Sequence, residues 1–81
     1  MRIEFSERVQ KKFNVLSAVI VKAFRKQVEF LKFDLRHPSL HAKKYDEASD
    51  VWQARINNDW RFYFLIKNDC YTIIDISKHP K

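Results

Sequence analysis

The spacing of hydrophobic residues changes at Val51 from a helical to an alternating pattern, and this change constrains the fold most. Apolar and polar residues alternate over 51–56, 60–66 and 70–76, a period typical of half-buried β-strands. Polar residues separate these segments at 57–59 and 67–69. The chain has no glycine, and Asn and Asp tolerate the left-handed conformation of hairpin turns better than most other residues. The sequence therefore predicts three consecutive strands joined by turns of Asn and Asp.

The first half of the chain is predicted to hold one strand and two helices. Alternation over 2–5 favours a strand, and Ser6 can cap a helix by accepting a backbone N–H. The first helix has apolar residues at helical spacing: Val9, Phe13 and Leu16. A second stripe starts near Ser17 and should end at His37–Pro38; it consists of Ile20, Phe24, Val28, Leu31 and Leu35. The polar segment 38–50 is predicted to be a loop.

These elements predict a single α+β domain over residues 1–81 with the order β-α-α-β-β-β. We expect an antiparallel sheet with a helical hairpin packed on one face. A chain of 81 residues is close to the lower size limit of a self-sufficient core, so a second domain does not fit.

The composition limits the class of function. Sixteen Lys and Arg against ten Asp and Glu give a net charge of +6, which attracts polyanions or acidic proteins. The longest apolar run, 18–21, is too short to span a membrane, and the N-terminus lacks the apolar core of a secretion signal. Cys70 is the only cysteine, and we expect it to be buried. The sequence predicts a soluble, cytoplasmic protein without a membrane partner.

Alternation also predicts which side chains lie on the open face of the sheet. Arg55, Arg61 and Tyr63 should point away from the helices, with His79 or Lys81 approaching from the chain end. Arg and Tyr on such a face suit phosphate contact and stacking on an unpaired base. The same residues are also common on a solvated sheet face without function. Alternation alone leaves both interpretations open.

Several features together resemble the RelE/ParE superfamily of toxins from bacterial toxin–antitoxin modules. They are the order of elements, the loop HPSLHAKKY at 37–45, the hairpin W-x-x-R-I…W-R-F-Y-F at 52–64 and the ending IIDISKHPK at 73–81. The resemblance covers essentially the whole chain and implies a RelE-like fold. It also implies the toxin of a type II module, in which a cognate antitoxin neutralises the toxin. RelE-branch toxins cleave mRNA in the ribosomal A site, whereas ParE-branch toxins inhibit DNA gyrase.

The short, basic chain with a histidine near its end is more similar to the RelE branch, which implies a ribosome-dependent endoribonuclease without metal or cofactor. In this chemistry a ribose 2′-hydroxyl attacks the neighbouring phosphate and releases a 5′-hydroxyl. The resemblance implies that Arg61 stabilises the phosphate, because a guanidinium can bond two oxygens. Arg55 would bind phosphate or favour 2′-hydroxyl deprotonation. His79 would transfer protons, and Lys81 would replace or assist it.

Further residues are candidates for binding RNA or the antitoxin. The RNA-binding candidates come from the loop and from the open sheet face: Lys43, Lys44, Gln53 and Tyr63. Phe30 and Phe33 point away from the stripe of the second helix, and two exposed phenylalanines suggest a docking groove for an antitoxin helix. The alternative for this pair is packing against the terminal strand.

Two other interpretations stay open. A ParE-like chain would inhibit DNA gyrase, and a catalytically degenerate member would only bind its antitoxin. His37 and His41 are four residues apart, but Pro38 between them breaks the helix that would align them on a metal. We therefore interpret both as loop histidines, and no metal site is predicted.

Overall fold

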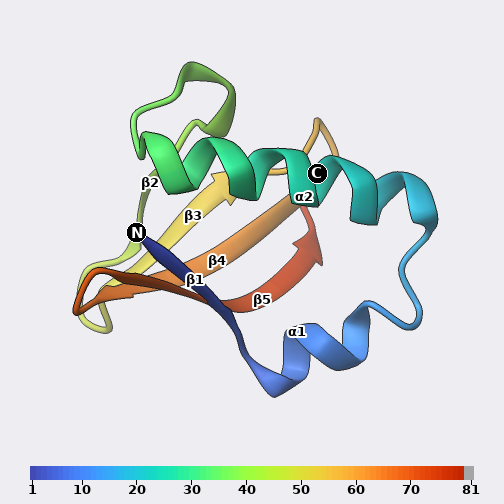
Figure 1. Ribbon diagram of the computed structural model, residues 1–81, viewed down its shortest axis with the longest axis horizontal. Coiled ribbons are helices and arrows are strands. Elements are labelled where there is room, and N and C mark those ends of the chain that lie inside the picture. Colours follow the sequence, from blue (N-terminus) through green and yellow to red (C-terminus); the bar gives the residue numbers. More distant parts are fainter. Residues whose placement is uncertain (80–81) are drawn as a thin grey trace.

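The computed structural model describes residues 1–79 and has an α+β architecture (Figure 1). Its elements in chain order are β1 (Arg2–Phe5), α1 (Glu7–Lys12), α2 (Ala18–Phe33), the 3₁₀ helix η1 (Pro38–Leu40), β2 (Lys43–Asp46), β3 (Val51–Arg55), β4 (Trp60–Lys67) and β5 (Cys70–Lys78). Within the described residues the strands form one five-stranded sheet in the order β1-β5-β4-β3-β2. The predicted fold class and the predicted run of three strands are confirmed.

The two edge strands differ from the prediction. β1 runs parallel to β5, with Arg2 opposite Cys70, so the sheet is mixed rather than antiparallel. These are the first and last strands of the chain, and no local pattern determines their relative direction. β2 pairs antiparallel with β3, inside the segment that was predicted to be a loop. Its sequence KKYD is largely exposed at the sheet edge, and it therefore lacks the apolar alternation that would have predicted a strand.

The turns of the β3–β4–β5 meander form without glycine in two different ways. Asn68 and Asp69 have φ values of 49° and 60°, the left-handed conformation that was predicted. No residue of 57–59 has a positive φ, so that prediction is wrong for the first turn. There the side-chain oxygen of Asn57 accepts the backbone N–H groups of Asp59 (2.8 Å) and Trp60 (2.9 Å). Such a side-chain turn reverses the chain without left-handed backbone.

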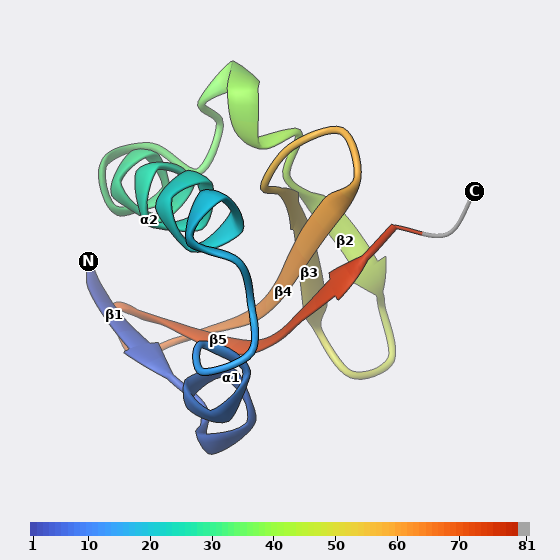
Figure 2. The same cartoon turned by 90° about the vertical axis from the view of Figure 1, so that its right-hand side faces the viewer.

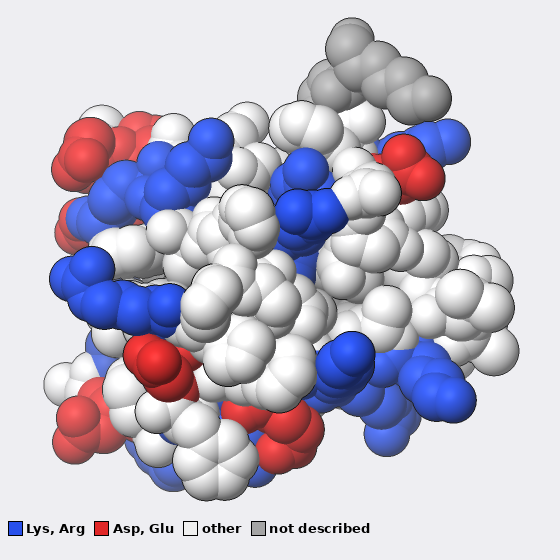
Figure 3. Space-filling view, turned by 90° about the horizontal axis from the view of Figure 1, so that it is seen from above, with Lys and Arg blue, Asp and Glu red and all other residues white. Residues whose placement is uncertain are grey.

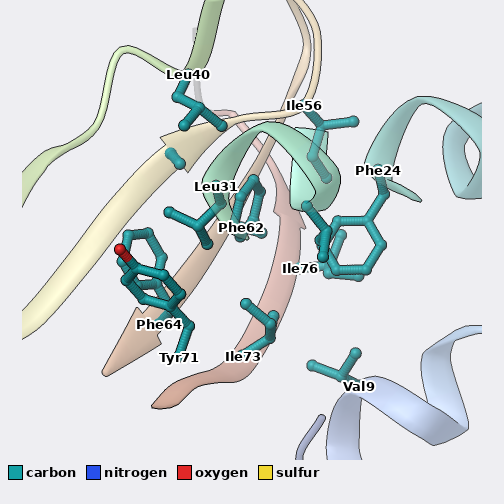
Figure 4. Close-up of a cluster of buried hydrophobic side chains, with 12 residues drawn as sticks. Val9, Phe24, Leu31, Leu40, Ile56, Phe62, Phe64, Tyr71, Ile73 and Ile76 are labelled. Carbon is teal, nitrogen blue, oxygen red and sulfur yellow. The ribbon is translucent and has the colours of Figure 1, made fainter. Parts of the chain in front are cut away.

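α2 packs over one face of the sheet (Figure 2), and an aromatic core lies between them (Figure 4). Phe24 of α2 packs edge-to-face on Phe62 of β4, with ring centroids 5.2 Å apart. Phe64 of β4 contacts Tyr71 of β5 in the same way at 5.6 Å. The largest fully buried side chains are Phe24, Phe62, Phe64, Leu31, Leu40, Ile73, Ile76 and Val9. Burial of these side chains is the main favourable term for folding.

Polar caps define both ends of α2. The Ser17 side chain accepts the backbone N–H of Ile20 at 3.3 Å, as expected for an N-cap. The helix ends at Phe33, with Asp34 as its cap, and not at the predicted His37. The centre of the predicted stripe is buried and its two ends are half-buried; the buried members are Phe24, Val28 and Leu31, and the half-buried ones are Ile20 and Leu35.

α1 lies along the edge of β5, beyond the end of β1 (Figure 2). The Ser6 backbone N–H donates to the Ile73 carbonyl at 2.9 Å, and the Ser6 hydroxyl donates to the Ile74 carbonyl at 3.2 Å. Further along, Lys12 Nζ donates to the Ile76 carbonyl at 2.5 Å. These bonds satisfy strand carbonyls that an open sheet edge would leave exposed. α1 therefore closes the edge of the sheet, while α2 covers its face.

Removal of the Phe24 ring is expected to destabilise the fold strongly. Phe24 is fully buried, and a Phe→Ala change in a core typically costs about 3–5 kcal/mol. Urea denaturation followed by circular dichroism should show this loss for Phe24→Ala. Val19→Ala is the matched control, because Val19 on the same helix is 74% exposed, and its free energy of unfolding should change by less than about 0.5 kcal/mol. Equal losses in the two variants would contradict the packing described.

Candidate nucleic-acid interface

The sheet face opposite α2 carries polar and cationic side chains from neighbouring strands. Arg55 of β3 lies opposite Arg61 of β4, and Gln53 lies opposite Tyr63. Directly opposed residues share one face of a sheet, so the arginines and Tyr63 are on the open face, as the alternation predicts. Lys43 of β2 lies opposite Gln53 and therefore joins this face.

An open pocket of about 430 Å³ lies on this face, and it brings most of the predicted catalytic residues together. Its lining consists of His41, Ala42, Lys43, Gln53, Ala54, Arg55, Arg61 and His79. Lys81, the remaining predicted catalytic residue, is outside the described residues.

Figure 3 shows Lys and Arg side chains in several separate groups on the side viewed, one of them in a hollow near the centre. The positive charge is thus distributed in patches rather than spread evenly.

The β3–β4 turn holds the Arg61 side chain. Arg61 Nη1 donates to the backbone carbonyls of Asn57 at 2.6 Å and Trp60 at 3.0 Å, with a longer contact to Asn58 at 3.4 Å. All three bonds use the same nitrogen, so Nη2 and Nε have no hydrogen-bond partner among residues 1–79. A half-buried guanidinium with two free donor positions is suited to a ligand that has two oxygens in one plane.

Arg55 contacts the same turn and a histidine of the preceding loop. Its Nη2 donates to the side-chain oxygen of Asn58, and its Nη1 lies 3.3 Å from Nε2 of His41. His41 was predicted to be an ordinary loop histidine, and its place in the pocket was not predicted. No sequence signal could have revealed this contact, because the two residues are fourteen positions apart in different elements.

Neither pocket arginine is neutralised by an acidic side chain in the described part of the protein. The ion pairs there involve other cations, namely Arg8, Lys11, Lys12, Lys32 and Lys44. Asp75 lies opposite Tyr63 on the open face, but its carboxylate is bound by Lys12 at 2.6 Å and by Arg8 at 3.6 Å. Two directly opposed arginines without a carboxylate leave a local excess of positive charge.

The chain end holds His79 beside the two arginines. The His79 backbone N–H donates to the Asp59 carbonyl at 2.6 Å, which attaches the segment after β5 to the β3–β4 turn. The His79 side chain is exposed and lines the pocket. One turn therefore contacts Arg61, Arg55 and the backbone of His79.

The two neighbouring lysines Lys43 and Lys44, both predicted to bind RNA, lie on opposite faces of β2. Lys43 is exposed at the pocket. Lys44 lies opposite Trp52, 5.5 Å above its ring, and its Nζ donates to the Asp50 carboxylate at 2.7 Å. This hydrogen bond raises the pKa of Lys44 and lowers the pKa of Asp50. The structure thus places Lys44 away from the pocket, as part of an ion pair.

Gln53 and Tyr63, the other predicted RNA-binding residues, contact each other. Gln53 is buried, and its Nε2 donates to the Tyr63 hydroxyl at 3.4 Å. Tyr63 is half-buried and packs edge-on against the exposed ring of Tyr45 at 4.9 Å. Gln53 therefore orients Tyr63, and the accessible aromatic surface of this region belongs mainly to Tyr45.

Only one of the two phenylalanines predicted to be exposed is so. Phe33 is 86% exposed. Phe30 is half-buried and stacks on the His37 ring at 3.9 Å with an interplanar angle of 6°. The prediction of an exposed pair is therefore wrong for Phe30, because the loop after α2 folds back onto it. Cys70 is buried, as expected.

Two further features, a cluster of metal ligands and a membrane-spanning helix, are absent from residues 1–79. No group of three or more His, Cys, Asp or Glu side chains is arranged there to hold a metal ion. No helix among these residues has the length and apolar character needed to cross a membrane.

The fold is similar to that of solved structures of RelE, YoeB and ParE toxins. No family model and no curated protein matches the sequence, but solved structures match over nearly the whole chain. A chain of the archaeal RelE–RelB complex from Pyrococcus horikoshii superposes with a TM-score of 0.79 at 16% identity, covering 95% of this chain and 92% of that one. The YoeB/ParE toxin from Agrobacterium tumefaciens also gives 0.79, at 13% identity over 99% and 100%.

A chain of the YoeB–YefM complex from Staphylococcus aureus gives a TM-score of 0.75 at 16% identity over 99% and 98%. These similarities confirm, at the level of the fold, the resemblance that the sequence indicated. Function depends on the site rather than on the fold.

The Lys44–Asp50 ion pair predicts how Asp50 titrates. Lys44→Met should raise the pKa of Asp50 towards its ordinary value of 3.8, whereas Lys43→Met, on the opposite face, should leave it unchanged. A carboxylate with a lowered pKa stabilises the fold above the ordinary value, and this contribution is lost as the pH falls through the lower folded value. An NMR pH titration of the Asp50 carboxyl measures the shift. An unchanged Asp50 titration in Lys44→Met would contradict the pairing.

Proposed function

We propose that this protein is the toxin of a type II toxin–antitoxin module and acts as a ribosome-dependent endoribonuclease that cleaves mRNA in the A site. The observation that carries the proposal is the pair Arg55 and Arg61, directly opposed on the open face and without a carboxylate partner in the described residues. Like charges in this position destabilise a sheet. A phosphate bound between the two arginines would replace this repulsion by two charge-assisted hydrogen-bond systems.

The proposed reaction needs charge stabilisation more than any other form of catalysis. When the 2′-oxygen attacks phosphorus and the bond to the 5′-oxygen breaks, negative charge spreads over the non-bridging oxygens. Donors fixed in advance at this position stabilise the transition state more than water does, because they need no reorganisation. Arg61 supplies free Nη2 and Nε donors while the turn carbonyls hold its Nη1. Arg55 supplies the second guanidinium across the strand pair.

His79 is the group that would protonate the leaving 5′-oxygen. An imidazole gains and loses protons close to neutral pH, which arginine does not do. The hydrogen bond from the His79 backbone to Asp59 keeps this side chain at the pocket edge. We propose that Lys81 assists by holding phosphate. The products are a 2′,3′-cyclic phosphate and a 5′-hydroxyl end, and no metal ion or cofactor takes part in these steps.

Binding to the ribosome and to mRNA would depend on the overall charge and on Lys43. The net charge of +6 attracts RNA at long range. Lys43 is exposed beside the arginine pair, where it would contact a neighbouring phosphate. Tyr63 and the Tyr45 ring packed on it offer a surface on which an unpaired base can stack.

A cognate antitoxin is the second proposed partner. Two of the matching structures are complexes, RelE–RelB and YoeB–YefM, and this supports a comparable neutralising protein for this chain in the cytoplasm. Phe33 on α2 is 86% exposed, so it is the apolar contact we assign to the antitoxin. Phe30 is excluded from this role because its ring is stacked on His37.

Arg61→Ala is expected to abolish toxicity and mRNA cleavage while the fold persists. Loss of one preorganised transition-state donor typically lowers the rate about 10²–10³-fold. The chain would be induced in a bacterium that lacks the antitoxin, and new 5′-hydroxyl ends on translated messages would be mapped. Arg25→Ala is the matched control, because Arg25 is exposed on α2, away from the pocket. The proposal expects cuts at a fixed position within codons for the wild type and this control.

Other outcomes of the same experiment contradict the ribonuclease. Growth arrest with intact messages and DNA damage signalling would point to a ParE-like gyrase inhibitor. No arrest at all would leave antitoxin binding as the function. Cleavage that persists in Arg61→Ala would remove Arg61 from the mechanism.

The two lysines of β2 provide a matched pair for RNA affinity. Lys43→Ala and Lys44→Ala each remove one positive charge, so the long-range attraction falls equally. Lys43→Ala should in addition lose a phosphate contact and reduce the slope of log affinity against log salt by about 0.7, the value for one contact to single-stranded RNA. Lys44→Ala should leave this slope unchanged. Fluorescence anisotropy with a labelled single-stranded RNA measures both slopes, and equal slopes would mean that Lys43 contacts no phosphate.

A further inference from the structure

His41 has a left-handed backbone conformation, which is uncommon for residues other than glycine. Its φ and ψ are 48° and 41° at the end of η1, in a region that most residues with a Cβ avoid and that Asn, Asp and His occupy more often. Residues held in this region without glycine often occur at functional sites, where the surrounding structure compensates the strain. In this conformation the exposed imidazole of His41 lines the pocket that contains Arg55 and Arg61.

The imidazole of His41 contacts Arg55 through Nε2. His41 Nε2 lies 3.3 Å from Arg55 Nη1. A guanidinium only donates hydrogen bonds, so Nε2 must be the acceptor in this contact. The contact is thus a hydrogen bond in the tautomer that carries its proton on Nδ1, and the donor and acceptor roles of the ring depend on this tautomer. An imidazole of this tautomer that lines the pocket beside the two arginines has the chemical form of a general base.

The proposed function leaves the base of the reaction unassigned, since a free arginine is a poor proton acceptor. We infer that His41 is the general base of this site and that it acts opposite His79, the general acid; the inference rests on the proposed ribonuclease function. When phosphate binds, Arg55 turns its donors to the phosphate oxygens and releases Nε2 of His41. Nε2 then accepts the proton of the 2′-hydroxyl as the 2′-oxygen forms its bond to phosphorus. The bond from phosphorus to the 5′-oxygen breaks, and the 5′-oxygen takes a proton from His79.

The charged and titratable groups around His41 come from every neighbouring element. The two pockets that His41 borders are lined by Arg36 and His37 of its own loop, Lys43 of β2, Arg55 of β3, Arg61 of β4 and His79 after β5. None of these lining groups is a carboxylate, so none would bind a protonated imidazole as an ion pair. This environment differs from that of a histidine that forms an ion pair with a carboxylate.

The alternative role for His41 is to position Arg55, and His41→Asn separates the two. Asn tolerates left-handed backbone and retains a side-chain oxygen that can accept from Arg55, but it cannot take up a proton. His37→Asn is the matched control in the same loop, because the His37 side chain only caps Ser39 (3.2 Å) and stacks on Phe30, and Asn is also a good cap. Circular dichroism would first show that both variants fold as the wild type does.

The test is single-turnover cleavage of a message on programmed ribosomes by the antitoxin-free protein, over about pH 5 to 8, the range in which histidines change charge. We expect wild type and His37→Asn to lose rate towards acid pH. His41→Asn should be slower by about 100-fold or more and should no longer show this loss, because no base remains to be protonated.

Three results would overturn the inference. Cleavage by His41→Asn within about threefold of wild type would remove His41 from the chemistry while the ribonuclease function stood. A slow variant that kept the acid-side loss of rate, with weaker RNA binding, would make His41 a positioning residue for Arg55. No cleavage by the wild type, with Arg61→Ala indistinguishable from it, would refute the proposed function and the role of His41 together.

Discussion

The edge-to-face contact between Phe24 and Phe62 determines which face of the sheet is covered and which is open. β4 is the central strand of the five in the described chain, and Phe62 and Phe64 direct their rings into the core. Because side chains alternate along a strand, Arg61 and Tyr63 must point the other way. A slip of one residue would bury Arg61 and expose Phe62. The hydrophobic core therefore holds the arginines on the open face without contacting them.

The β3–β4 turn connects this core to the chemistry of the pocket. Asn57 shapes the turn with its side chain and holds Arg61 with its backbone carbonyl. The same turn contacts Arg55 through Asn58 and the chain end through Asp59. A site supported by hydrogen bonds from one short turn between two central strands is more rigid than one assembled from separate loops. The opposed arginines reduce sheet stability, and the turn carbonyls offset part of this loss by partially neutralising one guanidinium.

The sequence correctly predicted the helices and strands whose apolar residues recur with a regular period. Alternation over β3 and β4 was enough to place Arg55 and Arg61 together, because the turn between them is short. The parallel pairing of β1 with β5 depends on the two ends of the chain and has no local signal. The strand β2 was missed because an exposed edge strand does not need apolar alternation. The different positions of Lys43 and Lys44 follow directly from that missed strand, since only a strand places successive residues on opposite faces.

The place of His41 in the pocket could not be predicted from the sequence for a related reason. Its contact with Arg55 brings together a loop and a strand whose relation is set by the whole fold. The same holds for Phe30, which is covered only because the loop after α2 returns over it. In both cases a tertiary contact between segments determines where the side chain lies, and local sequence patterns do not encode such a contact.

The absence of glycine from the turns also affects the unfolded state of the protein. Within the described residues four side-chain-bearing residues have positive φ, namely His41, Asp50, Asn68 and Asp69. Each adds strain to the folded chain, but each also leaves the unfolded chain with fewer accessible conformations than glycine would. Folding of this chain therefore loses less backbone entropy than folding of a chain with glycine at these turns. The lower conformational entropy of the unfolded chain therefore offsets part of the strain that these four residues add to the native structure.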